Sequence, residues 1–168
     1  MQWFIISLVV AFLLGSVMWV MPSPRQRYQA KLRLEARQKG IQVQMVQLTL
    51  PRALGEMEPE VRTVAAYRFP RTNLERRERD HWRGWEVLRI DTLHNRGLPE
   101  HWSWSKGAKA LQPAALEQLH TLLQQLPEGV LGVESTPLSL TFYWDERGDE
   151  TRLDLLHRLA QQAVAQKI

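Results

Sequence analysis

The sequence predicts an α+β protein: one N-terminal transmembrane helix, a basic juxtamembrane helix, and then a small antiparallel-sheet domain with two helices. Three observations lead to this prediction. Residues 3–21 contain no charged side chain. Several later segments alternate apolar and polar residues, as strands with one buried face do, and two others repeat apolar residues at helical spacing. Because strands and helices do not alternate regularly, the order β-β-β-α-β-β-α favours antiparallel pairing.

The 168 residues divide into a transmembrane anchor over 1–21, a juxtamembrane helix over 22–40 and a cytoplasmic domain over 41–168. A domain of this length can bury a core without metals or disulfides. The chain contains no cysteine, which excludes disulfide frameworks, thiolate zinc sites and cysteine nucleophiles.

The anchor is predicted from the uncharged run 3–21. As a helix this run is about 28 Å long, close to the ~30 Å hydrocarbon core of a bilayer. Trp3 and Trp19 lie near its two ends, where indole rings prefer the membrane interface. A cleavable signal peptide is the alternative, but no basic residue precedes the run, and Pro and Arg follow it. We therefore expect the anchor to be retained.

Basic residues follow the apolar run and set its orientation. Residues 25–39 carry six basic residues and one acidic residue, whereas 40–168 is nearly neutral, so the net charge of +4 is juxtamembrane. This asymmetry predicts a single-pass protein of the cell inner membrane, with its N-terminus outside and its domain in the cytoplasm. It also favours a membrane surface over DNA as a partner. The predicted membrane-interface residues are Trp3, Trp19, Arg25, Arg27, Lys31, Arg33, Arg37 and Lys39.

Two further features of this region predict contacts. Ser7, Ala11 and Gly15 recur every four residues and form a strip of small side chains on which another membrane helix could pack, although such residues are also common in spans without that role. In the juxtamembrane helix, Ser23 is the expected N-cap and Gly40 the expected C-terminal stop. The apolar stripe of this helix is flanked by cations and consists of Tyr28, Leu32 and Ala36. The helix either lies on anionic lipid or forms a solvated stalk.

The apolar run followed by PSPRQRYQAKLRLEARQKGIQVQMV resembles the start of YajC, the small accessory subunit of the bacterial preprotein translocase. That family has a span, a basic helix rich in Pro, Gln and Arg, a Lys-Gly pair (here Lys39 and Gly40) and then a strand. The similarity covers about 45 residues. The family's glycine-rich turn is missing from IQVQMVQLTLPRALGE, and the rest of the chain has no counterpart there. The layout is also similar to that of other single-pass bacterial membrane proteins.

The domain begins with residues 41–50, which alternate as a strand until the apolar phase flips after Met45. The flip indicates a bulge, or a strand that reaches two environments. Residues 63–69 and 85–90 are expected to be strands, joined by a charged connection with a short helix. Residues 101–105 are expected to form an edge segment.

The second half of the domain predicts a helix, a hairpin and a last helix. The first helix opens at Pro113 and ends before Pro127. Residues 130–134 and 138–144 flank a Ser-Thr-Pro turn and are expected to form the hairpin. The last helix follows the turn 145–149 and directs leucines and alanines toward the core. The carboxylates around that turn are interpreted as capping groups, which negative charge at a helix N-terminus favours.

No motif predicts an enzyme. The five histidines show no metal-ligand spacing, and the sequence lacks a phosphate-binding glycine loop, His-Glu-x-x-His and Gly-x-Ser-x-Gly. We therefore predict no catalytic residue, no metal site, no cofactor and no small-molecule ligand. Indole rings anchor protein partners, which makes Trp82, Trp85, Trp102 and Trp104 the candidate partner-binding residues. The alternatives are packing in the core, and stacking on nucleic-acid bases beside a local excess of arginine.

These features together predict a membrane-anchored accessory or scaffold protein that acts through protein–protein contacts in an inner-membrane complex. The resemblance to the translocase subunit implies that this complex is translocase-associated. The predicted partners are a bilayer with anionic headgroups and a membrane protein. A membrane-tethered nucleic-acid-binding protein is the alternative, and the near-neutral charge of 40–168 makes it less favoured.

Overall fold

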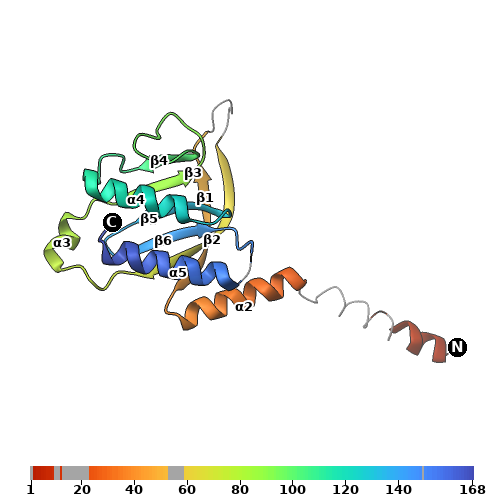
Figure 1. The fold of residues 1–168 in the computed structure, drawn as a ribbon. Coiled ribbons are helices and arrows are strands. Elements are labelled where there is room, and N and C mark those ends of the chain that lie inside the picture. The colour runs from red at the N-terminus through yellow and green to blue at the C-terminus, as the bar shows by residue number, and fades with distance from the viewer. Residues whose placement is uncertain (1, 10–11, 13–22, 53–58, 149) are drawn as a thin grey trace.

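The computed structural model describes residues 2–9, 12, 23–52, 59–148 and 150–168. Residues 2–9 are helical. The later elements, labelled in Figure 1, are α2 (Pro24–Gln38), β1 (Gln42–Leu50), β2 (Glu60–Pro70), α3 (Arg76–His81), β3 (Trp85–Arg89), β4 (Trp102–Lys106), α4 (Pro113–Gln125), β5 (Val130–Ser135), β6 (Ser139–Trp144) and α5 (Glu150–Ala165). The α+β class is confirmed, and the segment expected at 101–105 is β4.

All neighbouring strands are antiparallel, and the sheet has the order β1-β2-β6-β5-β3-β4. β1 and β2 form a long hairpin whose register runs without a shift from the pair Gln42–Arg68 to the pair Leu50–Glu60. β1 therefore contains no bulge. The flip in its apolar phase arises because the strand reaches two environments: Val43 packs against the main core, and the end of the strand packs on the other face of the sheet.

The main core lies between the sheet and helices α2, α4 and α5. Figure 1 shows α4 and α5 side by side across the face of the sheet. Burial of apolar surface in this layer is the dominant favourable contribution to folding. The leucines expected to face the core from α4 and α5 do so, and large rings from the strands fill the space beneath them: Tyr67, Trp85, Phe142 and Trp144.

A second, smaller apolar cluster lies on the opposite face of the sheet. Successive side chains of a strand point to opposite faces, so each strand can contribute to both clusters. The buried members of the second cluster come from β1, β2, β3 and β6 and are Leu48, Leu50, Val64, Ala66, Leu88 and Tyr143.

The prediction of an N-terminal transmembrane helix is wrong. Within the described residues, no helix combines the length and the apolar character needed to cross a bilayer. This finding corrects the fold class with an N-terminal membrane helix, the signal-anchor description, and the location as a single-pass inner-membrane protein. Residues 10–11 and 13–22, which include Ala11, Gly15 and Trp19, lie outside the described residues.

Candidate functional site

The basic helix α2 packs on the domain. Ser23 caps it as expected, since its side chain accepts a hydrogen bond from the Gln26 N–H at 3.2 Å, and Gly40 follows it with a φ of 77°. Leu32 and Ala36 are buried in the main core, with Tyr28 partly buried beside them. The apolar stripe of α2 therefore faces the sheet and α5.

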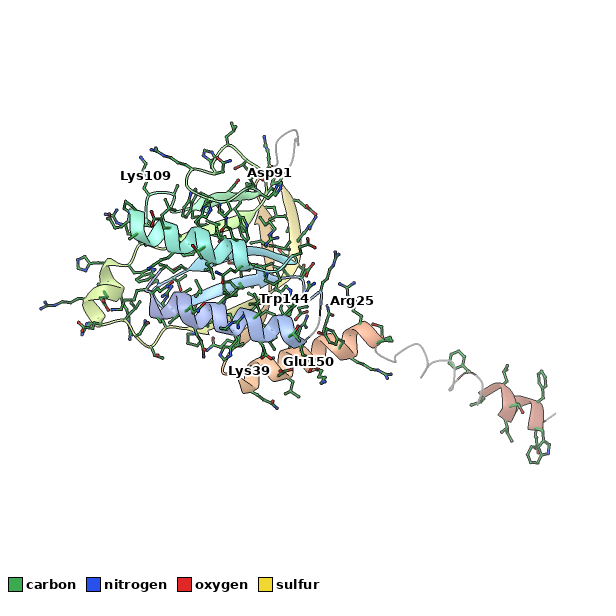
Figure 2. All side chains as sticks on the ribbon, viewed as in Figure 1. Arg25, Lys39, Asp91, Lys109, Trp144 and Glu150 are labelled. Carbon is green, nitrogen blue, oxygen red and sulfur yellow. The ribbon has the colours of Figure 1, made fainter. Side chains whose placement is uncertain are left out.

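Three of the predicted membrane-interface cations pair with carboxylates of residues 146–154. Lys31 donates to Glu150, Lys39 to Asp154, and Arg33 to Glu146. Figure 2 shows Lys39 at one end of α2, Arg25 at the other, and Glu150 at the start of α5. The hydrogen bond to Glu150 raises the pKa of Lys31. These carboxylates, interpreted from sequence as capping groups, pair in the structure with cations of α2.

The pair between Arg33 and Glu146 is the most buried of these contacts. The guanidinium donates from Nε at 2.7 Å and from a terminal nitrogen at 2.6 Å to the two carboxylate oxygens, and Glu146 is only 5% exposed. The Tyr67 hydroxyl donates to the same carboxylate at 2.9 Å. Hydrogen bonding to Glu146 raises the pKa of Arg33. Because the Ile41 N–H donates to the Ala36 carbonyl at 3.0 Å, the docked helix fixes the start of β1.

The other predicted site residues lie in different environments. Trp3 and Ser7 are exposed on the helical residues 2–9, where the Ser7 hydroxyl donates to the Trp3 carbonyl. Trp82 is half-buried, with the Arg71 guanidinium 4.4 Å from its ring centre. The remaining three candidate partner-binding rings are buried in the main core: Trp85, Trp102 and Trp104.

A groove of about 500 Å³ runs between α4 and α5. Its lining is rich in amides, which donate and accept hydrogen bonds but do not titrate: Gln118, Gln125, Gln162 and Gln166. Among the described residues, no group of three or more His, Asp and Glu side chains is placed to hold a metal ion.

The outer side of β1 presents unpaired backbone groups. Directly after β2, the Arg71 N–H donates to the Leu138 carbonyl at 2.8 Å, one step beyond the pair Pro70–Ser139. Backbone groups alternate in direction along a strand, so the odd-numbered residues of β2 face β6 and the even-numbered residues face β1. By register, the even-numbered residues of β1 bond to β2. The outward-facing residues of β1 are Val43, Met45, Gln47 and Thr49, and none of their backbone groups bonds to another described backbone group.

The composition of β1 leaves this edge unprotected. Proteins usually blunt an exposed sheet edge with a charged residue, a proline, a bulge or a covering segment. The nine residues of β1, QVQMVQLTL, contain no charge and no proline, and its pairing with β2 has no bulge. Met45 is 45% exposed, and Gln47 and Thr49 are exposed beside it.

The opposite edge of the sheet, β4, is covered by its own connecting loop. The Trp104 N–H donates to the His94 carbonyl at 2.7 Å, and the Trp102 N–H donates to the Pro99 carbonyl at 3.3 Å. The loop 91–101 therefore occupies outward backbone donors of β4. Only β1 leaves such groups free along its length among the described strand edges.

No protein-family model, no curated protein and no solved structure matches the chain. The fold and the edge define the protein by class: a small α+β protein with a six-stranded antiparallel sheet and an exposed edge at β1. Sequence reasoning missed this site because it did not give the order of the strands. The signal that could have drawn attention to it was the lack of charge and proline over residues 42–50.

Proposed function

We propose that the protein is an accessory or scaffold protein that acts through protein–protein contacts, and that the free side of β1 is its contact surface. The observation that supports this proposal is the row of outward backbone groups on Val43, Met45, Gln47 and Thr49. A partner segment in extended conformation can pair with such a row and add a strand to the sheet. Backbone hydrogen bonds then supply affinity, and the side chains beside them supply selectivity.

The side chains of β1 define what such a partner must offer. On the face shared with the helices, Met45, Gln47 and Thr49 are exposed and mostly polar. On the other face, Val46 is half-buried and packs against the second cluster beside Leu48. The partner strand is therefore expected to alternate, with apolar residues on the side that extends the second cluster. A neutral strand also suits β1, which has no charge to select an ionic partner.

Photo-cross-linking from the edge tests the proposal. A photoreactive residue replaces Gln47 in the full chain, and the matched control carries it at Ser105, an exposed residue of β4. We expect adducts from position 47 and few from position 105, because the loop 91–101 covers the edge of β4. Peptide mass fingerprints identify the cross-linked protein, a translocase subunit being the partner that the N-terminal resemblance implies.

A second substitution makes this test specific for strand addition. Met45→Lys places a charge on the exposed edge, a device that natural edges use against pairing. The substitution is expected to remove most of the adducts formed at position 47. Equal yields from positions 47 and 105, or yields unchanged by the lysine, would show that β1 is not the contact surface.

A further inference from the structure

We infer that the strand which pairs with β1 is the β1 of a second copy of this chain, antiparallel to the first about a two-fold axis at Val46. This inference rests on the proposed function, in which the β1 edge is the contact surface, and it names the partner. The two copies would join their sheets edge to edge. A two-fold contact of this kind is self-complementary, so each contact between two different residues occurs twice.

The register follows from the outward-facing residues. In an antiparallel pair, hydrogen bonds form between directly opposite residues whose backbone groups face each other. With the axis at Val46, Val43 lies opposite Thr49, and Met45 lies opposite Gln47. Every outward N–H and C=O group of β1 then has a partner on the other copy.

Neighbouring registers leave some of these groups without a partner. Moving the axis to Met45 places Thr49 opposite Ile41, whose N–H already donates to the Ala36 carbonyl. Moving it to Gln47 places Val43 opposite Pro51, which has no N–H. The axis at Val46 is therefore the register that the backbone of β1 favours for pairing with itself.

The side chains are compatible with this arrangement. Val46 faces Val46 of the other copy as a non-hydrogen-bonded pair, in which Cα atoms approach to about 4.5 Å. This contact would join the second clusters of the two copies across the axis. β1 carries no charge, so pairing it with itself brings no like charges together.

The basic helix α2 does not oppose the arrangement. α2 leads into the start of β1, and antiparallel pairing places the starts of the two strands at opposite ends of the contact. A strand of nine residues is about 30 Å long. The C-terminal ends of the two α2 helices, which lie next to these strand starts, are then separated by more than the ~8 Å Debye length at physiological ionic strength.

Disulfide cross-linking tests the register, because the chain has no cysteine of its own. In the full chain, Val46→Cys places two thiols opposite each other at the axis, within the Cα separation of about 4.4–6.8 Å that a disulfide needs. The control Gln44→Cys lies opposite Leu48 of the other copy, so its two thiols are about 13 Å apart along the strands. Under mild oxidation we expect the Val46→Cys chain to form covalent dimers at least about tenfold faster than the control.

A mixture of two exposed variants keeps the test valid if Val46→Cys disturbs the half-buried site. Met45→Cys and Gln47→Cys chains, mixed, should cross-link to each other faster than either alone, because these positions lie opposite each other. If Val46→Cys is no faster than Gln44→Cys and the mixture shows no gain, the second copy is not the partner. Position-47 photo-adducts with another protein would then leave the proposed function standing, and their absence would remove both proposals.

Discussion

Each edge strand of the sheet has an antiparallel neighbour on one side. The two edges differ in what lies on the other side. At β4, the loop 91–101 supplies carbonyls to outward N–H groups, and the strand is five residues long. At β1, nine residues run without charge, proline or bulge, and no described backbone group bonds to their outer side. Among the described residues, the loop 91–101 therefore bonds to the outer side of β4, whereas no segment bonds to the outer side of β1.

An unpaired edge of this length is a hazard for a chain that works alone, because it serves as a template for other strands. Proteins that keep such an edge use it for strand addition or for assembly. The contrast between β1 and β4 therefore supports the proposed role in binding. Substitutions at each edge separately test this contrast, with the free energy of unfolding and the pairing of the edge measured for each variant.

The largest expected effect on stability comes from proline substitutions in β1. They test whether its backbone groups alternate between facing β2 and facing outward. Val46→Pro removes an N–H that bonds to β2, and we expect it to lower the free energy of unfolding by about 2–3 kcal/mol. Gln47→Pro removes an outward N–H, which edge strands tolerate, and should cost less than about 1 kcal/mol while reducing pairing. Urea unfolding of both variants measures the difference. Equal costs would mean that the assigned directions of the β1 backbone groups are wrong.

A smaller effect is expected from loosening the loop that covers β4. The buried Ser103 hydroxyl donates to the Ile90 carbonyl at 2.7 Å and accepts from the Thr92 N–H at 3.1 Å. Ser103→Ala leaves both groups without this partner and should lower the free energy of unfolding by about 1–2 kcal/mol. Hydrogen exchange at the Trp104 amide should become faster, whereas exchange in β1 should not change. Ser105→Ala, at an exposed position of the same strand, is the control.

The smallest expected effect is a pH dependence confined to the β4 edge. His101 bonds to Asp91 at 2.9 Å within the covering loop, and this hydrogen bond raises the pKa of His101 above its usual value near 6.5. The contribution of the pair to loop stability is therefore complete below about pH 6.5 and is lost as the pH rises through the raised pKa. Amide exchange of β4, corrected for the intrinsic rate, should accelerate over this interval.

His101→Gln provides the comparison for that pH dependence. The variant cannot titrate at this position, so its β4 exchange should show little dependence on pH between 6 and 8. The β1 amides should respond to pH in neither protein. A similar response at both edges would show that the pair His101–Asp91 does not act locally on the loop.

Much of the fold could be predicted because local patterns carry it. Alternation predicted a strand from residue 41, a Ser-Thr-Pro turn predicted the hairpin after residue 130, and leucine spacing between two prolines predicted the helix from Pro113. The absence of charge over 3–21 predicted a membrane helix, but no helix of the described residues is long and apolar enough to cross a bilayer.

The candidate site depended on information that short windows of sequence do not contain. The pairing of Arg33 with Glu146 joins residues 113 positions apart, so the basic helix gave no sign of the carboxylate that holds it. The exposure of β1 depends on the strand order, in which β6 and β5 separate the hairpin β1–β2 from β3. Tryptophan content suggested a contact surface, yet Trp85 lies in the core because its strand is covered by helices.

The docking of α2 by residues 146–154 also orders events during synthesis. A ribosome adds about 5–20 residues per second, so Glu146 is made roughly 6 to 23 s after Arg33. Throughout that interval the cations of α2 have no carboxylates of residues 146–154 to bind, and its apolar stripe lacks α5. The helix made early is completed by a segment made late, and the start of β1 is fixed only then. Nascent chains shorter than about 146 residues should therefore expose α2 to whatever surrounds the ribosome.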